Sequence, residues 1–334
     1  IHSYRIIAGN DGGVSFPGEV LALRDNGKGG IPDMLIVNGF TRVSGPDTFD
    51  SDEIAGFYDA RDHGVPYVRD ISFIGSQFEF RRDIPWMDDD AAGFGASRAN
   101  YEDKVVAGNT FDFVYTHGEA IAAAGCSFIS SGIDAFAAAD SLPAVKAIDL
   151  ILGKQKEIKV GTGAYGTKYK TFTPAVQARL SDFCRRGGSV FVSGSYVATD
   201  LWDNPFSSAE TRDADCRFAT DVLGYRWRVG QATCEGNAYE VPSRFHQFRP
   251  ASYDFSTVLN EDCYAVESPD AVFAADAERG ATILRYGENN LAAGTAFDAG
   301  DYRTVVIGFP FETISAADSR TSLMNQILNF FKIK

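Results

Sequence analysis

The chain has 334 residues, of which 45% are hydrophobic and 23% are charged. This length and balance are typical of a globular protein with one large or two smaller domains, and they exclude a coiled coil, a collagen-like chain and a small disulfide-rich scaffold. The 45 acidic residues outnumber the 31 Lys and Arg residues. The resulting net charge of -14 argues against nucleic acid and anionic membrane surfaces as partners.

The first two dozen residues are expected to form a separate β-hairpin. We predict a strand over residues 4–8, a tight turn over residues 10–13 and a second strand over residues 20–23. The turn reads Asn-Asp-Gly-Gly, which allows positive φ angles. The pattern from Tyr4 to Pro17, Tyr-x-x-x-Ala-x-Asn-x-x-Gly-x-Ser-x-Pro, resembles the last two strands of a fibronectin type III domain.

That resemblance implies a longer, multidomain parent chain that is secreted or periplasmic. A polar, Gly-rich segment over residues 25–32 is typical of a linker. We therefore expect the end of a fibronectin type III-like domain over residues 1–24, a linker over residues 25–32 and one α/β domain over residues 33–334.

From residue 33 onward, strand-like and helix-like segments alternate. Strands are expected over residues 34–40, 126–130, 147–152, 189–193 and 304–309. Helices are expected over residues 111–124, 134–140, 173–186, 211–223 and 316–331, and residues 225–300 are β-rich. The irregular stretch over residues 41–109 indicates a long insertion after the first strand. This order predicts an α/β fold with an open, mostly parallel sheet flanked by helices, in which ligands bind at the carboxyl ends of the strands.

Residues 194–198 read Gly-Ser-Tyr-Val-Ala and stand where a nucleophile elbow would follow a strand. Here residues 33–331 resemble the class I glutamine amidotransferase-like group, a flavodoxin-like superfamily with a Gly-x-Cys-x-Gly elbow and a terminal motif like Phe-His-Pro-Glu. Tyr196 occupies the place of that cysteine, and residues 308–312, Gly-Phe-Pro-Phe-Glu, contain no histidine. Tyrosine is a poor nucleophile near neutral pH and phenylalanine is no base, so we expect no glutaminase activity.

Five residues near the predicted strand ends are candidates for catalysis. They are His117, Glu119, Ser195, Tyr196 and Glu312. His117 and Glu119 at a helix start could form a general acid–base pair, or a helix cap with a carboxylate that complements the dipole. Ser195, His117 and Asp200 have the residue types of a Ser-His-Asp arrangement, with a turn serine as the alternative for Ser195. The alternative for Glu312 is a surface or helix-capping carboxylate.

Other residues at the strand ends and in the insertion are candidates for substrate binding. They are Asn38, Arg42, Trp86, Gly153 and Asp200. The adjacent carboxylates of Asp88, Asp89 and Asp90 could hold Ca²⁺, or they could form a solvated acidic loop. We expect no other cofactor.

The five cysteines lack Cys-x-x-Cys spacing, which argues against a structural zinc site. Cys126 and Cys184 lie in apolar periodic segments and are expected to be buried thiols. A single disulfide, either Cys216 with Cys234 or Cys234 with Cys263, is the alternative for the others.

The chain also resembles the C-terminal region of secreted bacterial proteins labelled as xanthan lyases. Residues 34–40 (MLIVNGF), 108–112 (GNTFD) and 308–312 (GFPFE) carry this likeness. It implies a secreted, periplasmic or cell-surface protein with further domains, and a carbohydrate or peptidoglycan fragment as the partner. No run approaches the roughly 20 apolar residues of a membrane span.

These observations lead us to expect a domain without amidotransferase catalysis that binds glycan at the strand ends. The alternatives are a polysaccharide lyase or hydrolase with a non-standard site, and a structural spacer. A deep pocket holding His117 and Tyr196 would favour an enzyme, whereas a filled strand-end surface would favour a spacer.

Overall fold

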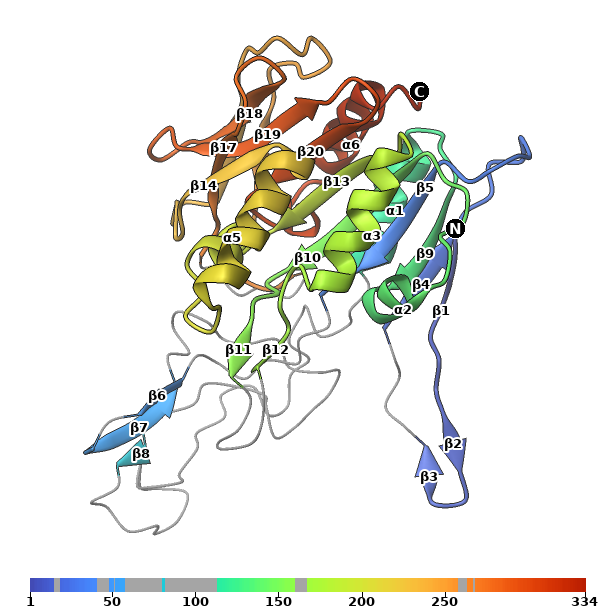
Figure 1. Cartoon of the computed structure of the whole chain (residues 1–334). Coiled ribbons are helices and arrows are strands. Elements are labelled where there is room, and N and C mark those ends of the chain that lie inside the picture. Colours follow the sequence, from blue (N-terminus) through green and yellow to red (C-terminus); the bar gives the residue numbers. More distant parts are fainter. Residues whose placement is uncertain are drawn as a thin grey trace.

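The computed structural model describes most of the chain apart from the insertion after the first predicted strand. The described residues are 1–14, 19–40, 48–50, 52–57, 80–81, 113–159, 167–257, 263–266 and 268–334. Within these residues, helices cover both faces of a nine-stranded sheet (Figure 1). The predicted α/β fold class is therefore confirmed.

Five parallel strands form one half of this sheet. In spatial order they are β9 (Phe128–Gly132), β5 (Met34–Asn38), β10 (Ala147–Gly153), β13 (Ser189–Gly194) and β20 (Arg303–Ile307). Counted along the chain, this order is second, first, third, fourth and fifth, which is the flavodoxin-like arrangement. The order reverses between β5 and β10, and sheets of this kind bind ligands outside the carboxyl ends of the strands at such a point.

Antiparallel strands extend the sheet beyond β20. They are β19 (Ala292–Asp298), β18 (Gly280–Tyr286), β15 (Asn237–Glu240) and β16 (Ser252–Asp254). The ribbon of β14 (Tyr225–Val229) and β17 (Ala271–Ala274) also comes from this part of the chain. The prediction that residues 225–300 are β-rich is confirmed.

Each face of the sheet has its own helical layer. Helices α1 (Phe113–Ala123) and α6 (Ala317–Phe330) pack on one face. The other face is covered by α2 (Ile133–Ala138), α3 (Pro174–Arg185) and the π-helical turn η2 (Phe218–Leu223). All residues of β5, β10 and β13 are buried between these layers, which explains their continuous apolar sequences.

The ends of α3 follow the sequence signals. The hydroxyl oxygen of Thr173 accepts a hydrogen bond from the backbone N–H of Val176, and Pro174 takes the first helical position. The helix stops at Gly187, which has a φ of 87° that glycine adopts without strain.

The helix predicted over residues 211–223 is divided in two. Helix α5 (Ala209–Arg217) continues into η2, where the hydroxyl of Thr220 donates to the carbonyl of Cys216. Two short helical turns complete the fold. They are α4 (Thr199–Trp202) after β13 and η3 (Phe311–Thr313) after β20.

The N-terminal residues form two small antiparallel pairs. β1 (His2–Tyr4) pairs with β4 (Leu21–Leu23), and β2 (Gly9–Asn10) pairs with β3 (Gly13–Val14) across the predicted Asn-Asp-Gly-Gly turn. The strand expected over residues 4–8 is wrong. The strand is His2–Tyr4, because only these residues lie opposite β4, and residues 5–8 are exposed.

The second half of this N-terminal segment packs against the α/β domain. The backbone N–H of Ala22 donates to the hydroxyl of Ser130, and that hydroxyl donates to the carbonyl of Ala22. Nη1 of Arg24 donates to the carbonyls of Ala122 and Cys126. Residues near β4 are therefore fixed to β9 and α1, while the assignment to a fibronectin type III-like domain stays a prediction.

Short strand pairs account for the other described elements. They are β6 (Thr48–Asp50), β7 (Ile54–Phe57) and β8 (Phe80–Arg81) in one sheet, and β11 (Ile158–Lys159) with β12 (Thr167–Lys168) in another. None of the helices in the described ranges is long and apolar enough to cross a membrane.

None of the five cysteines is in a disulfide, and Cys126 and Cys184 are buried as predicted. The alternative of a disulfide at Cys234 is therefore wrong: its thiol is exposed and is not bonded to Cys216 or Cys263.

The packing of Gly118 on α1 against Phe128 of the sheet gives a test of the fold. A β-carbon on Gly118 would lie 2.4 Å from Cζ of Phe128, whose ring is fully buried. We expect Gly118→Ala to lower the free energy of unfolding by about 1–3 kcal/mol, although alanine favours helix. Urea unfolding measures this, and the same change in a Phe128→Leu background should cost less. Equal costs in both backgrounds would contradict the contact.

Candidate functional site

A buried polar network ties α1 to the parallel half of the sheet. Nδ1 of His117 on α1 is 2.8 Å from Oδ2 of Asp149 on β10, and Nε2 is 3.2 Å from Oε2 of Glu312 in η3. The hydroxyl of Tyr264 donates to Oε1 of Glu312 at 2.7 Å. The side chains of His117 and Asp149 are fully inaccessible to solvent. The imidazole therefore lies between two carboxylates and has no solvent-accessible surface.

The charge of His117 is set by these two partners. Burial alone would lower the pKa of the imidazole, but the charges and hydrogen bonds of Asp149 and Glu312 raise it from 6.5 to about 9. Both ring nitrogens then carry protons and donate to carboxylates at neutral pH. An imidazolium held in this way is a poor general base, because a base must be unprotonated at the working pH.

The structure separates several residues that the sequence suggested might act together. Glu119 is exposed, whereas His117 two positions earlier is buried, because residues two apart on a helix do not share a face. Asp200 is hydrogen-bonded to Thr171 rather than to His117. Neither the pair of His117 with Glu119 nor the Ser-His-Asp arrangement with Ser195 is therefore assembled.

Glu312 is the one predicted catalytic residue that the structure places against His117. Its side chain is buried, so the alternative of a surface carboxylate is wrong. The burial follows from η3, which turns the chain after β20 back over α1.

The turn after β13 contains the predicted catalytic residues Ser195 and Tyr196. The backbone N–H of Ser195 donates to the carbonyl of Gly153 at 2.8 Å, which links this turn to the end of β10. The hydroxyl of Ser195 is buried and has no hydrogen-bond partner in the part of the chain that the structure describes. The ring of Tyr196 is 6% exposed and faces Nζ of Lys156 at 4.9 Å. This turn therefore places a largely buried aromatic ring next to the ammonium group of Lys156.

Asp270 holds this turn, although the sequence gave no reason to single it out. Its Oδ2 accepts hydrogen bonds from the backbone N–H groups of Ala198 at 2.7 Å and Thr199 at 2.8 Å. Burial raises the pKa of Asp270 to about 7, while these hydrogen bonds lower it. Because 71 residues separate Asp270 from Thr199 in the chain, no local pattern could have predicted the contact.

A second group of residues that the sequence did not indicate lies beyond the ends of β10 and β13. We define the rim cluster as Glu157, Lys170, Asn204 and Phe206. Nζ of Lys170 is 3.7 Å from Oε2 of Glu157, and Nδ2 of Asn204 donates to the same carboxylate oxygen. The backbone N–H of Phe206 donates to Oδ1 of Asn204 at 2.8 Å, and the Phe206 ring is 44% exposed.

Asp200 anchors the rim cluster rather than facing solvent. Its Oδ1 accepts from the backbone N–H of Glu157 at 2.8 Å, and its Oδ2 accepts from the backbone N–H and the hydroxyl of Thr171. Burial raises the pKa of Asp200, whereas these hydrogen bonds lower it. A carboxylate with this many internal donors positions the residues around it.

The remaining predicted binding residues divide into two groups. Asn38 is buried and donates to Oε2 of Glu19, and Gly153 has a φ of 48° with Phe40 packed against it, so both have structural contacts. The other predicted residues lie outside the described residues. They are Arg42, Trp86, Asp88, Asp89 and Asp90. Within the described ranges, no group of three or more His, Cys, Asp or Glu is placed to hold a metal ion.

No protein-family model and no curated protein matches the chain. Among solved structures, it is similar to a β-galactosidase from Rahnella sp. R3 with 15% identity and a TM-score of 0.43, over 74% of this chain and 29% of that one. It is similar to a carbohydrate deacetylase with 10% identity and a TM-score of 0.37, over 65% of this chain and 30% of that one.

A cytoplasmic protein from Salmonella typhimurium is similar over more of its own length. The identity is 11% and the TM-score 0.45, over 89% of this chain and 98% of that one. The chain spans less than a third of the β-galactosidase and the deacetylase. Identities and TM-scores this low assign neither a family nor an activity to this chain.

The buried imidazolium gives a prediction about stability and its pH dependence. His117→Gln leaves Asp149 and Glu312 without their cation, so we expect a loss of about 3–5 kcal/mol in the free energy of unfolding by urea. The pKa of His117 is raised on folding, so its contribution is fully present below pH 6.5 and is lost as the pH rises through about 9.

The difference between the wild type and His117→Gln should therefore shrink above pH 9. His246→Gln is the matched control, because His246 is exposed and its replacement should leave stability unchanged. A difference for His117→Gln that stays constant across this pH range would contradict the charged state.

Proposed function

We propose that this chain is a glycan-binding α/β domain of a secreted, cell-envelope-associated protein and that it has no glutaminase activity. The observation that carries the proposal is the exposed ring of Phe206 within a polar cluster at the carboxyl edge of the sheet. This edge is where flavodoxin-like sheets bind their ligands.

The residues that could carry out amidotransfer chemistry support a domain without catalysis. Tyr196 stands at the elbow in place of a thiol, and its hydroxyl has a much higher ordinary pKa than a cysteine. His117 is the only histidine in the described network, and its two nitrogens face Asp149 and Glu312. A thiol nucleophile and a free imidazole base are therefore both missing from the described part of this edge.

The rim cluster has the chemistry that sugar binding needs. An exposed aromatic ring can pack against the C–H face of a pyranose, which buries apolar surface on both partners. The carboxylate of Glu157 and the ammonium of Lys170, which also pairs with Asp215 at 2.7 Å, keep partly exposed side chains that can exchange hydrogen bonds with ring hydroxyls. The amide of Asn204 is buried and holds Glu157 in place.

The cellular setting rests on the resemblances in the sequence. The fibronectin type III-like pattern in the first 17 residues and the likeness to secreted proteins labelled as xanthan lyases both favour an extracellular glycan or a peptidoglycan fragment as the ligand. The neighbouring domains of a longer chain would then bring this surface to the envelope or to a polysaccharide.

Binding of soluble glycans tests the proposal. We expect calorimetric titration with xanthan fragments, host glycans and muropeptides to show saturable binding of at least one class. Phe206→Ala should weaken that binding about tenfold, or about 1.4 kcal/mol, because the stacking surface is lost. The matched control is Phe273→Ala, since Phe273 is also an exposed ring and lies on β17, away from the rim cluster.

Two results would contradict the proposal. Equal effects of Phe206→Ala and Phe273→Ala would mean that the rim cluster is not the binding surface. Release of glycan products, detected by mass spectrometry and abolished by Tyr196→Phe, would show an enzyme with a non-standard site instead.

A further inference from the structure

The chain contains two Asn-Gly pairs, Asn26 with Gly27 in the predicted linker and Asn38 with Gly39 at the end of β5. In such a pair the backbone nitrogen of the glycine can close a cyclic imide on Cγ of the asparagine, and glycine has no β-carbon to hinder the approach. The two pairs lie in opposite environments, so their reactivity should differ.

The backbone after Asn26 has room to rearrange. Gly27 is exposed, its φ is 74°, and a β-carbon built on it would meet no atom within 4 Å. The N–H of Gly27 donates to Oδ1 of Asp25 at 2.9 Å, and this carboxylate is on an exposed residue. Water can replace an exposed partner of this kind at little cost. The nitrogen of Gly27 is therefore open to solvent and can lose its proton.

The side chain of Asn26 is polarised by its own turn. The backbone N–H of Lys28 donates to Oδ1 of Asn26 at 3.0 Å. A donor therefore stands where negative charge develops when a nucleophile adds to Cγ. The amide nitrogen Nδ2, which would leave, is 3.3 Å from Oδ2 of Asp33, and this is longer than an ordinary N–H···O hydrogen bond. The leaving nitrogen is held only weakly.

Asn38 precedes a glycine too, but its surroundings are fixed. It is 1% exposed, and it pairs with Ile151 on one side of β5 and with Gly132 on the other. The N–H of Gly39 donates to the carbonyl of Ile151 at 2.7 Å, and a β-carbon on Gly39 would lie 2.7 Å from the same oxygen. Attack on Asn38 would require this central strand to open, which costs a large part of the free energy of unfolding.

We propose that Asn26 is a site of spontaneous deamidation and that Asn38 is not. The nitrogen of Gly27 loses its proton to water or hydroxide and bonds to Cγ of Asn26. The bond from Cγ to Nδ2 breaks, and this nitrogen takes up a proton from water and leaves as ammonia. Water then adds to the cyclic imide and opens it at either carbonyl, which gives aspartate or isoaspartate at position 26.

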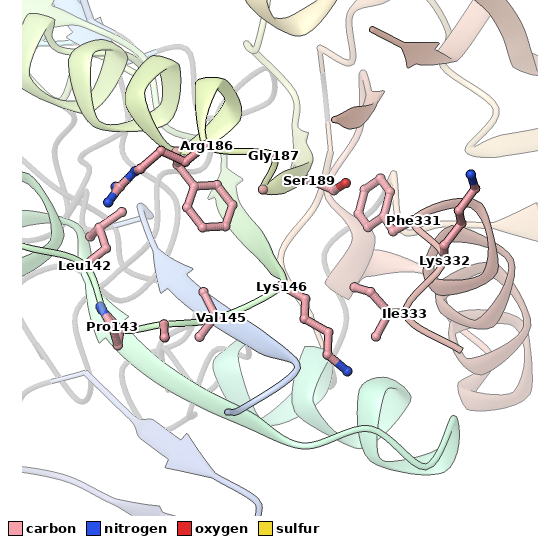
Figure 2. A pocket seen from close by; sticks show the side chains of 13 residues that line it. Leu142, Pro143, Val145, Lys146, Arg186, Gly187, Ser189, Phe331, Lys332 and Ile333 are labelled. Atoms are coloured by element: carbon pink, nitrogen blue, oxygen red, sulfur yellow. The ribbon is translucent and has the colours of Figure 1, made fainter. Parts of the chain in front are cut away.

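The new negative charge faces a carboxylate that joins two strands. Oδ2 of Asp33, just before β5, accepts hydrogen bonds from the backbone N–H and the hydroxyl of Ser127, just before β9, at 2.9 and 3.0 Å. Oδ1 of Asp33 is 2.6 Å from Nζ of Lys146, which lines a cavity of about 480 Å³ beside the amino ends of β10 and β13 (Figure 2). Deamidation of Asn26 replaces a donor to Asp33 by a like charge, so it weakens the attachment of the linker to this edge.

Peptide mapping of the whole chain after incubation at mildly alkaline pH tests the proposal. Trypsin cleaves after Arg24, Lys28 and Arg42, so residues 25–28 and 29–42 are recovered as separate peptides. We expect the peptide of residues 25–28 to convert from amide to carboxylate at least about tenfold faster than the peptide of residues 29–42, with isoaspartate among its products. An unincubated sample corrects for conversion during digestion. Equal rates in the two peptides, or no conversion of residues 25–28, would overturn the proposal.

Two alanine variants test the attack by the nitrogen of Gly27. Gly27→Ala and Gly29→Ala each add a β-carbon that meets no atom within 4 Å, at φ angles of 74° and 66°, so their backbone costs should match. Only the first adds it beside Asn26. We expect conversion of residues 25–28 to be about tenfold slower in Gly27→Ala and unchanged in Gly29→Ala. Equal rates in the two variants would overturn this attack.

The effect of the new charge is measured separately by thermal unfolding. Asn26→Asp supplies one of the products directly, and we expect a lower Tm than in the wild type because two carboxylates then face each other. Asn10→Asp is the matched control, since Asn10 is exposed and its Oδ1 accepts from the backbone N–H of Gly12, as a carboxylate also can. An unchanged Tm in Asn26→Asp, or equal losses in both variants, would overturn the repulsion with Asp33.

Discussion

Charged hydrogen bonds of one buried histidine join helix α1 to the central sheet, and the position of the other elements depends on this junction. His117 joins α1 to the middle of β10 through Asp149 and to the turn after β20 through Glu312. Burying three ionisable groups is costly unless they satisfy one another, and here each ring nitrogen faces one carboxylate. The network fixes the position of η3 over the sheet, and Tyr264 is tied to the same carboxylate.

This arrangement decides what the centre of the domain can do. Each ring N–H of His117 donates to one carboxylate, so neither proton leaves readily near neutral pH, and the side chains of His117 and Asp149 are inaccessible to solvent. The space between α1 and the described middle of the sheet is therefore filled by the protein's own polar groups. The exposed groups lie further out, where Asp200 and Asp270 fix the loops that follow β10 and β13.

The two edges of the parallel sheet differ in charge and in form. At the carboxyl edge, the exposed Phe206 ring follows a network of acidic and amide groups around Glu157 and Asn204. At the amino edge, the ends of α3 and α6 border a hollow lined by apolar and cationic residues. The strand direction separates these surfaces, because all loops after the parallel strands lie on one side and all loops before them lie on the other.

The local sequence determined several strands and helix ends, and the residue type in the turn after β13. Continuous apolar runs predicted β5, β10 and β13, and Thr173, Pro174 and Gly187 marked the ends of α3, since these signals act within a few residues. The sequence alone likewise shows a tyrosine, and so no thiol, at position 196 in the turn after β13. Only the tertiary structure decided the partners of His117, which are 32 and 195 residues away, and those of Asp270. Burial and charge pairing depend on which strands become neighbours, and no local period of the chain encodes that order.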